Sequence, residues 1–216
     1  DFPARCVTET VGPAELPAMA RALDLGCAVG RSSFELARVC SDVVGIDFSR
    51  RFVETAQRLQ RGETVDYAVV DQGELRRHLQ ARAPAEVDRT RLHFEVGDAM
   101  ALRDDLGTFD VVVMANLLCR LADPRKCLAR LPALVRPGGR LVITTPSTWR
   151  QIHTPRENWL GGFDRDGRAV RTLDGLKTAL ASDFVLRTRR DMPLLIREHA
   201  RKYEYIVAEA TVWQRA

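Results

Sequence analysis

Long apolar runs, lysine and closely spaced cysteines are scarce in this sequence of 216 residues. No apolar run approaches the roughly 20 residues that a membrane-spanning helix requires, which excludes a helical membrane protein, and we expect no membrane partner. The five cysteines are scattered and lack the C-x-x-C spacing of zinc and redox sites. We therefore expect reduced thiols, a cytoplasmic protein and no bound metal.

Clustered charge is also lacking. The 33 basic residues, of which lysine supplies only positions 126, 177 and 202, are spread among 29 acidic residues and leave a formal net charge of +4. Proteins that bind nucleic acid usually gather their basic residues on one face, so we expect no nucleic-acid partner. The chain does not begin with a basic segment followed by an apolar one, so we expect no secretory signal, although an upstream segment could have been removed.

Short β-branched runs alternate with helical patterns along the first two thirds of the chain. The runs cover residues 21–26, 43–47, 91–98, 109–116 and 139–146, and the helical patterns cover 32–39, 49–60 and 123–135. Ser32 and Glu35 have the spacing of a capping box at the start of the first helix. Strands that are apolar on both faces and joined by helices indicate an α/β protein with a parallel sheet and helices on both faces.

The last third has a different pattern. A loop-like segment with two tryptophans follows residue 146, a helix is expected over 173–182, and period-two alternation over 184–193 and 203–213 predicts a closing antiparallel hairpin. Residues 61–90 form a polar insertion, in which we expect a helix near 73–82.

The segment "LDLGCAVGRSSFELA" places a turn between the first strand and the first helix. Gly26, Ala28 and Gly30 recur at every second position, and Asp24 stands two residues before the first glycine. A carboxylate at this place repels a pyrophosphate but suits a ligand that carries an ammonium and a sulfonium. The turn resembles motif I, D/E-x-G-x-G-x-G, of the class I S-adenosylmethionine-dependent methyltransferases, with Ala28 in place of the middle glycine.

Two further acids follow the next strands. Asp47 ends the second strand, where a carboxylate can accept ribose hydroxyls, a feature that nicotinamide-binding proteins share. By the resemblance, Asp98 lies at the adenine amino group, Phe48 lies against the adenine face, and Asn116 borders the methyl donor. The full set of residues expected to bind S-adenosylmethionine, and S-adenosylhomocysteine as product, is Asp24, Gly26, Cys27, Ala28, Gly30, Arg31, Asp47, Phe48, Asp98, Ala99 and Asn116. Taken singly, Gly26 and Gly30 could be turn glycines, Asp24 a helix cap, Asp98 a turn former and Asn116 an ordinary strand-end residue.

Longer strings are more specific. "RALDLGCAVGRSSFELAR", "GIDFS", "MANLLCRL", "TPRENWLGGF" and "IREHARKYEYIVAEATVW" together resemble the methyltransferase domain at the C-terminus of ovothiol-biosynthesis enzymes. The resemblance implies a Rossmann-like domain over residues 1–216 with a seven-stranded, mainly parallel sheet and an antiparallel C-terminal hairpin. Residues 15–146 would be the cofactor-binding core, and 147–216 the substrate lid loop and hairpin. It also implies methylation of an imidazole nitrogen of 5-thiohistidine, or of its selenium analogue.

That family usually carries a fused iron-dependent sulfoxide synthase, and this sequence has no part that resembles one. The chain is therefore expected to be either a free-standing domain or an excised one, with such a synthase as the upstream source of its substrate.

A thiohistidine offers a carboxylate, an ammonium and a flat ring, so its pocket should supply an arginine fork, an acid and aromatic faces. We expect Arg197, Arg201, Tyr203 and Tyr205 to share one face of an extended strand. The predicted substrate-binding residues are Tyr67, Trp149, Trp159, Phe163, Arg197, Glu198, Tyr203 and Tyr205, and the predicted catalytic residues are Asn116 and Tyr203. Packing in the core or a solvated surface pair explains the same residues equally well.

Other functions fit parts of this pattern. A methyltransferase could act on a different metabolite or on nucleic acid, and the chain could also be a cofactor-binding module without catalysis. A nicotinamide oxidoreductase shares the glycine turn and the acid after the second strand. His153 and His199 lie in polar stretches and are interpreted as surface residues.

Overall fold

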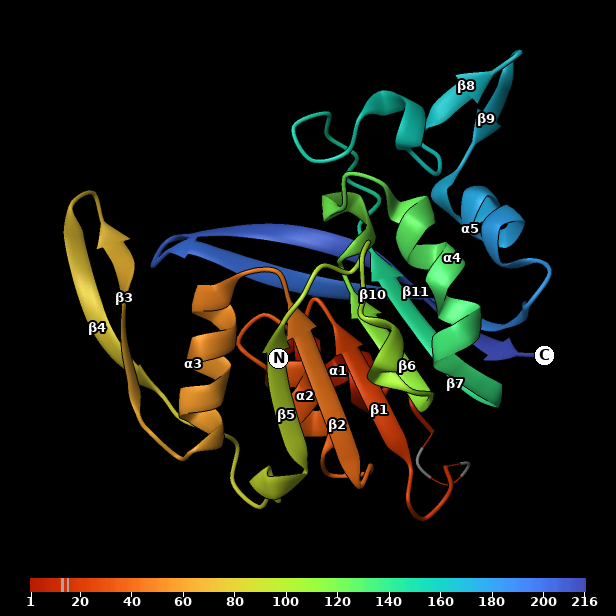
Figure 1. Cartoon of the computed structure of the whole chain (residues 1–216). Coiled ribbons are helices and arrows are strands. Elements are labelled where there is room, and N and C mark those ends of the chain that lie inside the picture. The colour runs from red at the N-terminus through yellow and green to blue at the C-terminus, as the bar shows by residue number, and fades with distance from the viewer. Residues whose placement is uncertain (13, 15) are drawn as a thin grey trace.

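A parallel sheet with an antiparallel edge forms the centre of the protein in a computed structural model that describes residues 1–12, 14 and 16–216. Among these residues, seven strands form one sheet in the order β10-β11-β7-β6-β1-β2-β5 (Figure 1). Their bounds are Arg21–Leu25 for β1, Asp42–Asp47 for β2, Leu92–Val96 for β5, Phe109–Ala115 for β6, Val135–Thr145 for β7, Phe184–His199 for β10 and Lys202–Arg215 for β11. Strand β11 pairs antiparallel with both β7 and β10, and the other neighbours are parallel.

Helices cover both faces of this sheet, as the apolar strands require. Three helices, α1 (Phe2–Thr8), α2 (Arg31–Leu36) and α3 (Arg50–Gln60), pack on one face, and α4 (Pro124–Leu134) and α5 (Thr172–Leu180) pack on the other. Alternate residues of β6 pack into the two hydrophobic cores on opposite faces of the sheet. Val111 and Val113 lie on the α1–α3 side and Val112 on the α4–α5 side. Short 3-10 turns occupy Arg89–Arg91, Asp104–Leu106, Leu118–Arg120 and Arg156–Asn158. The predicted Rossmann-like fold is confirmed.

The polar insertion differs from the prediction. The expected helix near 73–82 is wrong, because β3 (Val65–Gln72) and β4 (Leu75–Ala81) form an antiparallel hairpin there. Gly73 has φ +54° in the two-residue turn that joins Gln72 to its partner Leu75. This conformation favours glycine and closes a hairpin, so the β-branched run in β3 has a strand partner within reach.

Three other local predictions need correction. The helix α2 begins after Gly30, which has φ +88° and caps it without a side chain, so the predicted capping box of Ser32 and Glu35 does not form. Strand β7 begins at Val135, directly after α4, and pairs there with Phe109. The loop expected after residue 146 contains a small hairpin, β8 (Phe163–Arg165) with β9 (Arg168–Val170).

The β10–β11 hairpin extends well past the sheet edge (Figure 1). Its far end contacts β3 of the insertion, and β3 also contacts α3. Arg197 pairs with Tyr203 and Leu195 with Tyr205, so these side chains share one face of the hairpin. The expectation that Arg201 shares this face is wrong, because Arg201 lies in the turn between the two strands. No helix among the described residues is long and apolar enough to cross a membrane.

Candidate functional site

A cavity of about 610 Å³ opens at the carboxyl ends of β1, β2, β5 and β6. Open parallel sheets bind ligands at this edge, because the loops that follow the strands converge there. The residues that line the cavity are Gly26, Ile46, Asp47, Phe48, Ser49, Phe52, Gly97, Asp98, Ala99, Met100, Ala115, Asn116, Leu117, Arg120, Leu121, Ala122, Ile152 and His153. The cavity therefore brings together Gly26, Asp47, Phe48, Asp98, Ala99 and Asn116 of the predicted cofactor-binding set.

The glycine turn forms the floor at the end of β1. Gly26 has φ +74°, and a Cβ added there would lie 2.9 Å from Cδ1 of Leu117. Ala28, which stands in place of the middle glycine of the motif, also has a positive φ of +49°. Left-handed backbone at these positions lets the chain reverse within a few residues and leaves the cavity floor free of side chains.

Asp24 lies beneath this turn with no exposed surface. The hydroxyls of Ser32 and Ser33, both in the first turn of α2, donate to its Oδ2 at 2.6 Å each. Burial raises the pKa of Asp24, and the two serine hydroxyls partly oppose that rise. Its Oδ1 is buried and has no hydrogen-bond partner among the described residues.

Asp47 and Asp98 are held by backbone amides at the ends of their strands. The carboxylate of Asp47 accepts from the N–H of Ala28 at 2.9 Å and from that of Ser49 at 2.8 Å. Asp98 accepts from the N–H of Met100 at 2.8 Å. Each carboxylate oxygen can accept more than one hydrogen bond, so both acids keep acceptor capacity toward the cavity.

An aromatic ring and an amide complete this part of the cavity. The ring of Phe48 is 79% exposed, an unusual position for a phenylalanine. Asn116 has φ +54°, and its Oδ1 accepts from the hydroxyl of Thr144 at 3.0 Å. Its backbone N–H donates to Thr144, but its side-chain amide nitrogen donates no hydrogen bond among the described residues, which leaves a donor at the end of β6.

Five predicted cofactor residues do not line the cavity: Asp24, Cys27, Ala28, Gly30 and Arg31. Cys27 is buried, and burial raises the pKa of its thiol, so this side chain is a packed apolar group rather than a nucleophile. The guanidinium of Arg31 forms ion pairs with Asp1 and Glu35.

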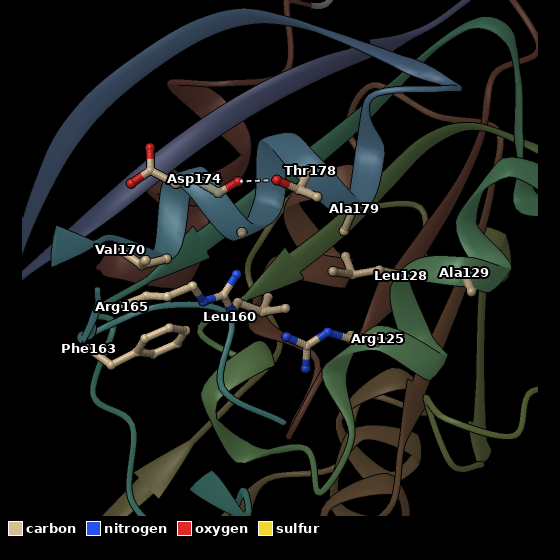
Figure 2. Close-up of a pocket in the computed structure, with 11 residues that line it drawn as sticks. Arg125, Leu128, Ala129, Leu160, Phe163, Arg165, Val170, Asp174, Thr178 and Ala179 are labelled. Atoms are coloured by element: carbon tan, nitrogen blue, oxygen red, sulfur yellow. Dashed lines mark hydrogen bonds between the residues drawn. The ribbon is translucent and has the colours of Figure 1, made fainter. Parts of the chain in front are cut away.

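The aromatic residues after β7 pack elsewhere. Trp149 is buried and donates to the hydroxyl of Thr172 at 2.9 Å, and Trp159 stacks on it with ring centroids 6.4 Å apart. Phe163 lines a second cavity, of about 460 Å³, between α4, α5 and the β8–β9 hairpin (Figure 2). In that view Phe163 faces Arg165, whose guanidinium carbon is 5.5 Å from the ring centroid. The structure therefore does not bring these three aromatic side chains to the lining of the strand-end cavity.

The far end of the β10–β11 hairpin carries the other predicted substrate residues. Arg197 lies opposite Tyr203, and its Nε is buried without a hydrogen-bond partner among the described residues. Glu198 forms an ion pair with Lys202 at 2.7 Å and not with Arg197. The rings of Tyr203 and Tyr205, and that of Tyr67 on the neighbouring β3, are each about half exposed.

Sequence reasoning missed one polar pair in the cavity. Nη1 of Arg120 lies 2.6 Å from Nε2 of His153, and both residues line the cavity. The polar segment around His153 predicts a surface residue, whereas the structure places His153 in the cavity lining. Only the fold brings the turn after β6 and the segment after β7 together, so no local pattern could have found the pair.

A family model described as a methyltransferase domain matches residues 4–183 of this chain. The chain belongs to the methyltransferase domain family. This membership confirms the predicted cofactor, S-adenosylmethionine, and the predicted class I methyltransferase domain.

Curated relatives of this methyltransferase domain include O-methyltransferases. The chain is 32% identical over 139 residues to the O-methyltransferase cnsE of Penicillium expansum, a match that covers 63% of this chain and 42% of the relative. It is 29% identical over 127 residues to a ubiquinone biosynthesis O-methyltransferase of Ralstonia nicotianae, with 58% and 42% covered. The matched segment thus spans less than half the length of these relatives.

Solved structures share the fold. An S-adenosylmethionine-dependent methyltransferase of Methanosarcina mazei matches with a TM-score of 0.61 at 20% identity, covering 93% of this chain and 94% of that one. The N-methyltransferase NodS of Bradyrhizobium japonicum, in complex with S-adenosylhomocysteine, matches with a TM-score of 0.58 at 17% identity, covering 99% and 83%. At these identities the likeness concerns the fold.

The cavity fits S-adenosylmethionine chemically. Asp24 places a buried carboxyl group, whose Oδ1 has no partner among the described residues, beneath the turn, and an acceptor there suits a cationic ligand better than a phosphate. Asp47 and Asp98 offer acceptors, and the exposed ring of Phe48 offers a stacking face. Among the described residues, no group of three His, Cys, Asp or Glu side chains lies close enough to hold a metal ion.

Proposed function

We propose that the protein transfers the methyl group of S-adenosylmethionine to an imidazole nitrogen of a 5-thiohistidine-type amino acid or its selenium analogue. The proposal combines the strand-end cavity with the resemblance of "TPRENWLGGF" and "IREHARKYEYIVAEATVW" to ovothiol-biosynthesis methyltransferase domains. The substrate would come from an enzyme of the sulfoxide synthase type in the same cytoplasm.

The observation that carries the substrate class is the pairing of Arg197 with Tyr203 on the β10–β11 hairpin. The Nε of Arg197 is buried and has no partner in the part of the chain that the structure describes, and a buried guanidinium nitrogen costs free energy unless a ligand accepts from it. A carboxylate is the planar acceptor that a guanidinium binds best. The phenol rings of Tyr203 and Tyr205 on β11 and of Tyr67 on β3 supply flat faces for a heteroaromatic ring.

Binding of the cofactor would rest on three strand ends. Asp47 would accept the ribose hydroxyls, Asp98 the adenine amino group, and Phe48 would cover the adenine face. When bound, S-adenosylmethionine supplies a methyl group activated by its sulfonium. The amide donor of Asn116, at the end of β6, would border that methyl group and orient the acceptor.

The residues of this cavity do not need to include a strong base. A neutral imidazole nitrogen brings its own lone pair, which forms the new nitrogen–carbon bond while the carbon–sulfur bond electrons return to sulfur. The ring proton stays on the other nitrogen. Catalysis would then come mainly from positioning, which can supply roughly 7–11 kcal/mol in well-oriented reactions.

Methylation of oxygen on a different small molecule is the second candidate. It is favoured by the matches to O-methyltransferases over more than half of this chain. A catalytically inactive cofactor-binding module is less well supported, because the side-chain donor of Asn116 has no acceptor among the described residues. A nucleic-acid methyltransferase is less well supported because the basic residues are dispersed.

An acceptor panel tests the proposal. The protein is incubated with S-adenosylmethionine and 5-thiohistidine, selenohistidine, histidine, a catechol or single-stranded RNA, and products are detected by mass spectrometry. A gain of one methyl group on thiohistidine or selenohistidine, with little on histidine, supports the proposal. Transfer only to the catechol favours the second candidate, and no transfer to any acceptor favours an inactive module.

A further inference from the structure

Arg120 and His153 meet at the opening of the cavity. Arg120 ends the 3-10 turn Leu118–Arg120 that follows β6, and His153 lies in the segment that follows β7. Their side chains are 2.6 Å apart between Nη1 and Nε2, and both line the cavity. Neither side chain is needed for the cofactor contacts described above, which come from the ends of β1, β2, β5 and β6.

Chemistry fixes the roles within this pair. A guanidinium has five N–H donors and no acceptor, so Nε2 of His153 must accept. The imidazole then carries its proton on Nδ1, where it is a donor. The pair therefore presents N–H donors and no acceptor to any further ligand.

Among the described residues, no carboxylate contacts the guanidinium of this pair directly, although Asp47 and Asp98 line the same cavity. Arg120 forms no ion pair within the part of the chain that the structure describes. The carboxylates that line the cavity, Asp47 and Asp98, already accept from backbone amides. An unpaired guanidinium with an imidazole N–H beside it is a binding site for an anion.

We propose that Arg120, oriented by His153, binds the anionic sulfur or selenium of the acceptor. The inference rests on the proposed function, because that acceptor carries a thiolate or selenolate near neutral pH. Sulfur is more nucleophilic than a ring nitrogen, so a site that methylates nitrogen must hold the sulfur out of line with the methyl group. Donors at Arg120 hold it there and lower its reactivity. Arg120 is then a specificity residue and His153 a positioning residue.

Variants of the pair test this assignment. Arg120→Met removes the charge, His153→Leu removes the acceptor that orients it, and His153→Gln keeps an acceptor oxygen. Arg150→Met is the matched control, because Arg150 is exposed in the same segment as His153 but lies outside the cavity lining. Three quantities are measured for each protein: the ratio of nitrogen-methylated to sulfur-methylated product, the affinity of the S-adenosylhomocysteine-loaded protein for thiohistidine and for histidine, and the affinity for S-adenosylhomocysteine.

The expected result is selective. Arg120→Met and His153→Leu lower the affinity for thiohistidine about 10-fold or more and raise the share of sulfur methylation, because a hydrogen bond to a charged group is lost. His153→Gln keeps most of the wild-type affinity for thiohistidine and of the wild-type product ratio. Arg150→Met changes neither the affinity nor the product ratio. Affinity for S-adenosylhomocysteine stays within about twofold of the wild-type value in every variant.

Three outcomes overturn the inference in different ways. If the wild-type protein methylates thiohistidine on nitrogen and Arg120→Met keeps the same product ratio and affinity, Arg120 does not hold the sulfur and the proposed function stands. If Arg120→Met mainly weakens S-adenosylhomocysteine, the pair serves the cofactor. If the wild-type protein neither binds nor methylates thiohistidine, the proposed function fails and this ligand assignment fails with it.

Discussion

Replacing Asp47 with alanine is the sharpest perturbation of the cofactor site. The carboxylate of Asp47 has two duties: it accepts from the backbone N–H groups of Ala28 and Ser49, and it is the proposed acceptor for both ribose hydroxyls. Asp47→Ala removes both. The turn after β1 loses one of its anchors, and the cofactor loses two hydrogen bonds.

The size of the effect follows from these contacts. Hydrogen bonds to a charged group contribute about 1.5–3 kcal/mol each, so two ribose contacts amount to about 3–6 kcal/mol. Since each 1.4 kcal/mol is a factor of ten, the dissociation constant should rise about 10²- to 10⁴-fold. Asp47 is only half-buried and water can replace it in part, so we expect the lower end, about 100-fold.

The assay is calorimetric titration of S-adenosylhomocysteine into the wild type, Asp47→Ala and a control, Asp42→Ala. Asp42 begins the same strand at the opposite edge of the sheet, where it pairs with Arg21. The control should keep wild-type affinity. A change below about threefold for Asp47→Ala, or an equal loss for Asp42→Ala, would refute the assignment of the ribose site.

The remaining predictions concern the acceptor, the buried acid and the tryptophans. Arg197→Met should raise the Michaelis constant for thiohistidine about 10-fold and leave that for S-adenosylmethionine unchanged, and steady-state kinetics with both unchanged would show that Arg197 does not bind the carboxylate. Burial raises the pKa of Asp24, so over a range of pH the folded protein holds a proton that the unfolded chain has released. The free energy of unfolding therefore falls as the pH rises from about 4, the ordinary carboxyl pKa, through the raised pKa of the folded state. Above the raised pKa this contribution no longer changes with pH. Asp24→Asn should remove that fall in urea unfolding across a pH series while weakening S-adenosylhomocysteine, and an unchanged pH profile would contradict the reasoning. Trp149→Phe should lose about 1–3 kcal/mol of stability, because the hydroxyl of Thr172 loses its donor, with the acceptor's Michaelis constant unchanged; a kinetic effect without a stability loss would place Trp149 in the site.

Much of the fold could be predicted from the sequence, because the order of apolar and polar residues along a strand indicates which of its faces are buried. The run "FDVVVMAN" is apolar on both faces, and its residues divide between the two cores as a central strand requires. The error at 73–82 has a physical cause: Leu75 and Leu79 have helical spacing, but the turn at Gly73 presents this segment to β3 as a strand partner. Whether a short amphipathic segment becomes a helix or a strand depends on such a partner, which local spacing does not encode.

Some residues of the candidate site could likewise be found from the sequence, and others only from the folded structure. Asp24, Asp47 and Asp98 could be found from sequence because each lies at or just past the carboxyl end of a strand, and parallel strands end at one edge. The roles of Trp149 and Phe163 could not, since an aromatic residue in a loop fits both packing and binding, and the structure places the first in the core and the second beside another cavity. The pair of Arg120 and His153 joins positions 33 residues apart, so only the folded chain reveals it.

The position of the transferred methyl group tests the central claim most directly. The protein is incubated with 5-thiohistidine and S-adenosylmethionine that carries a ¹³C-labelled methyl group, and the product is analysed by long-range carbon–proton NMR. The account predicts a methyl group correlated to the ring carbons beside the side chain, with the thiol still free. A methyl resonance typical of a thioether, or equal turnover of histidine, would contradict it.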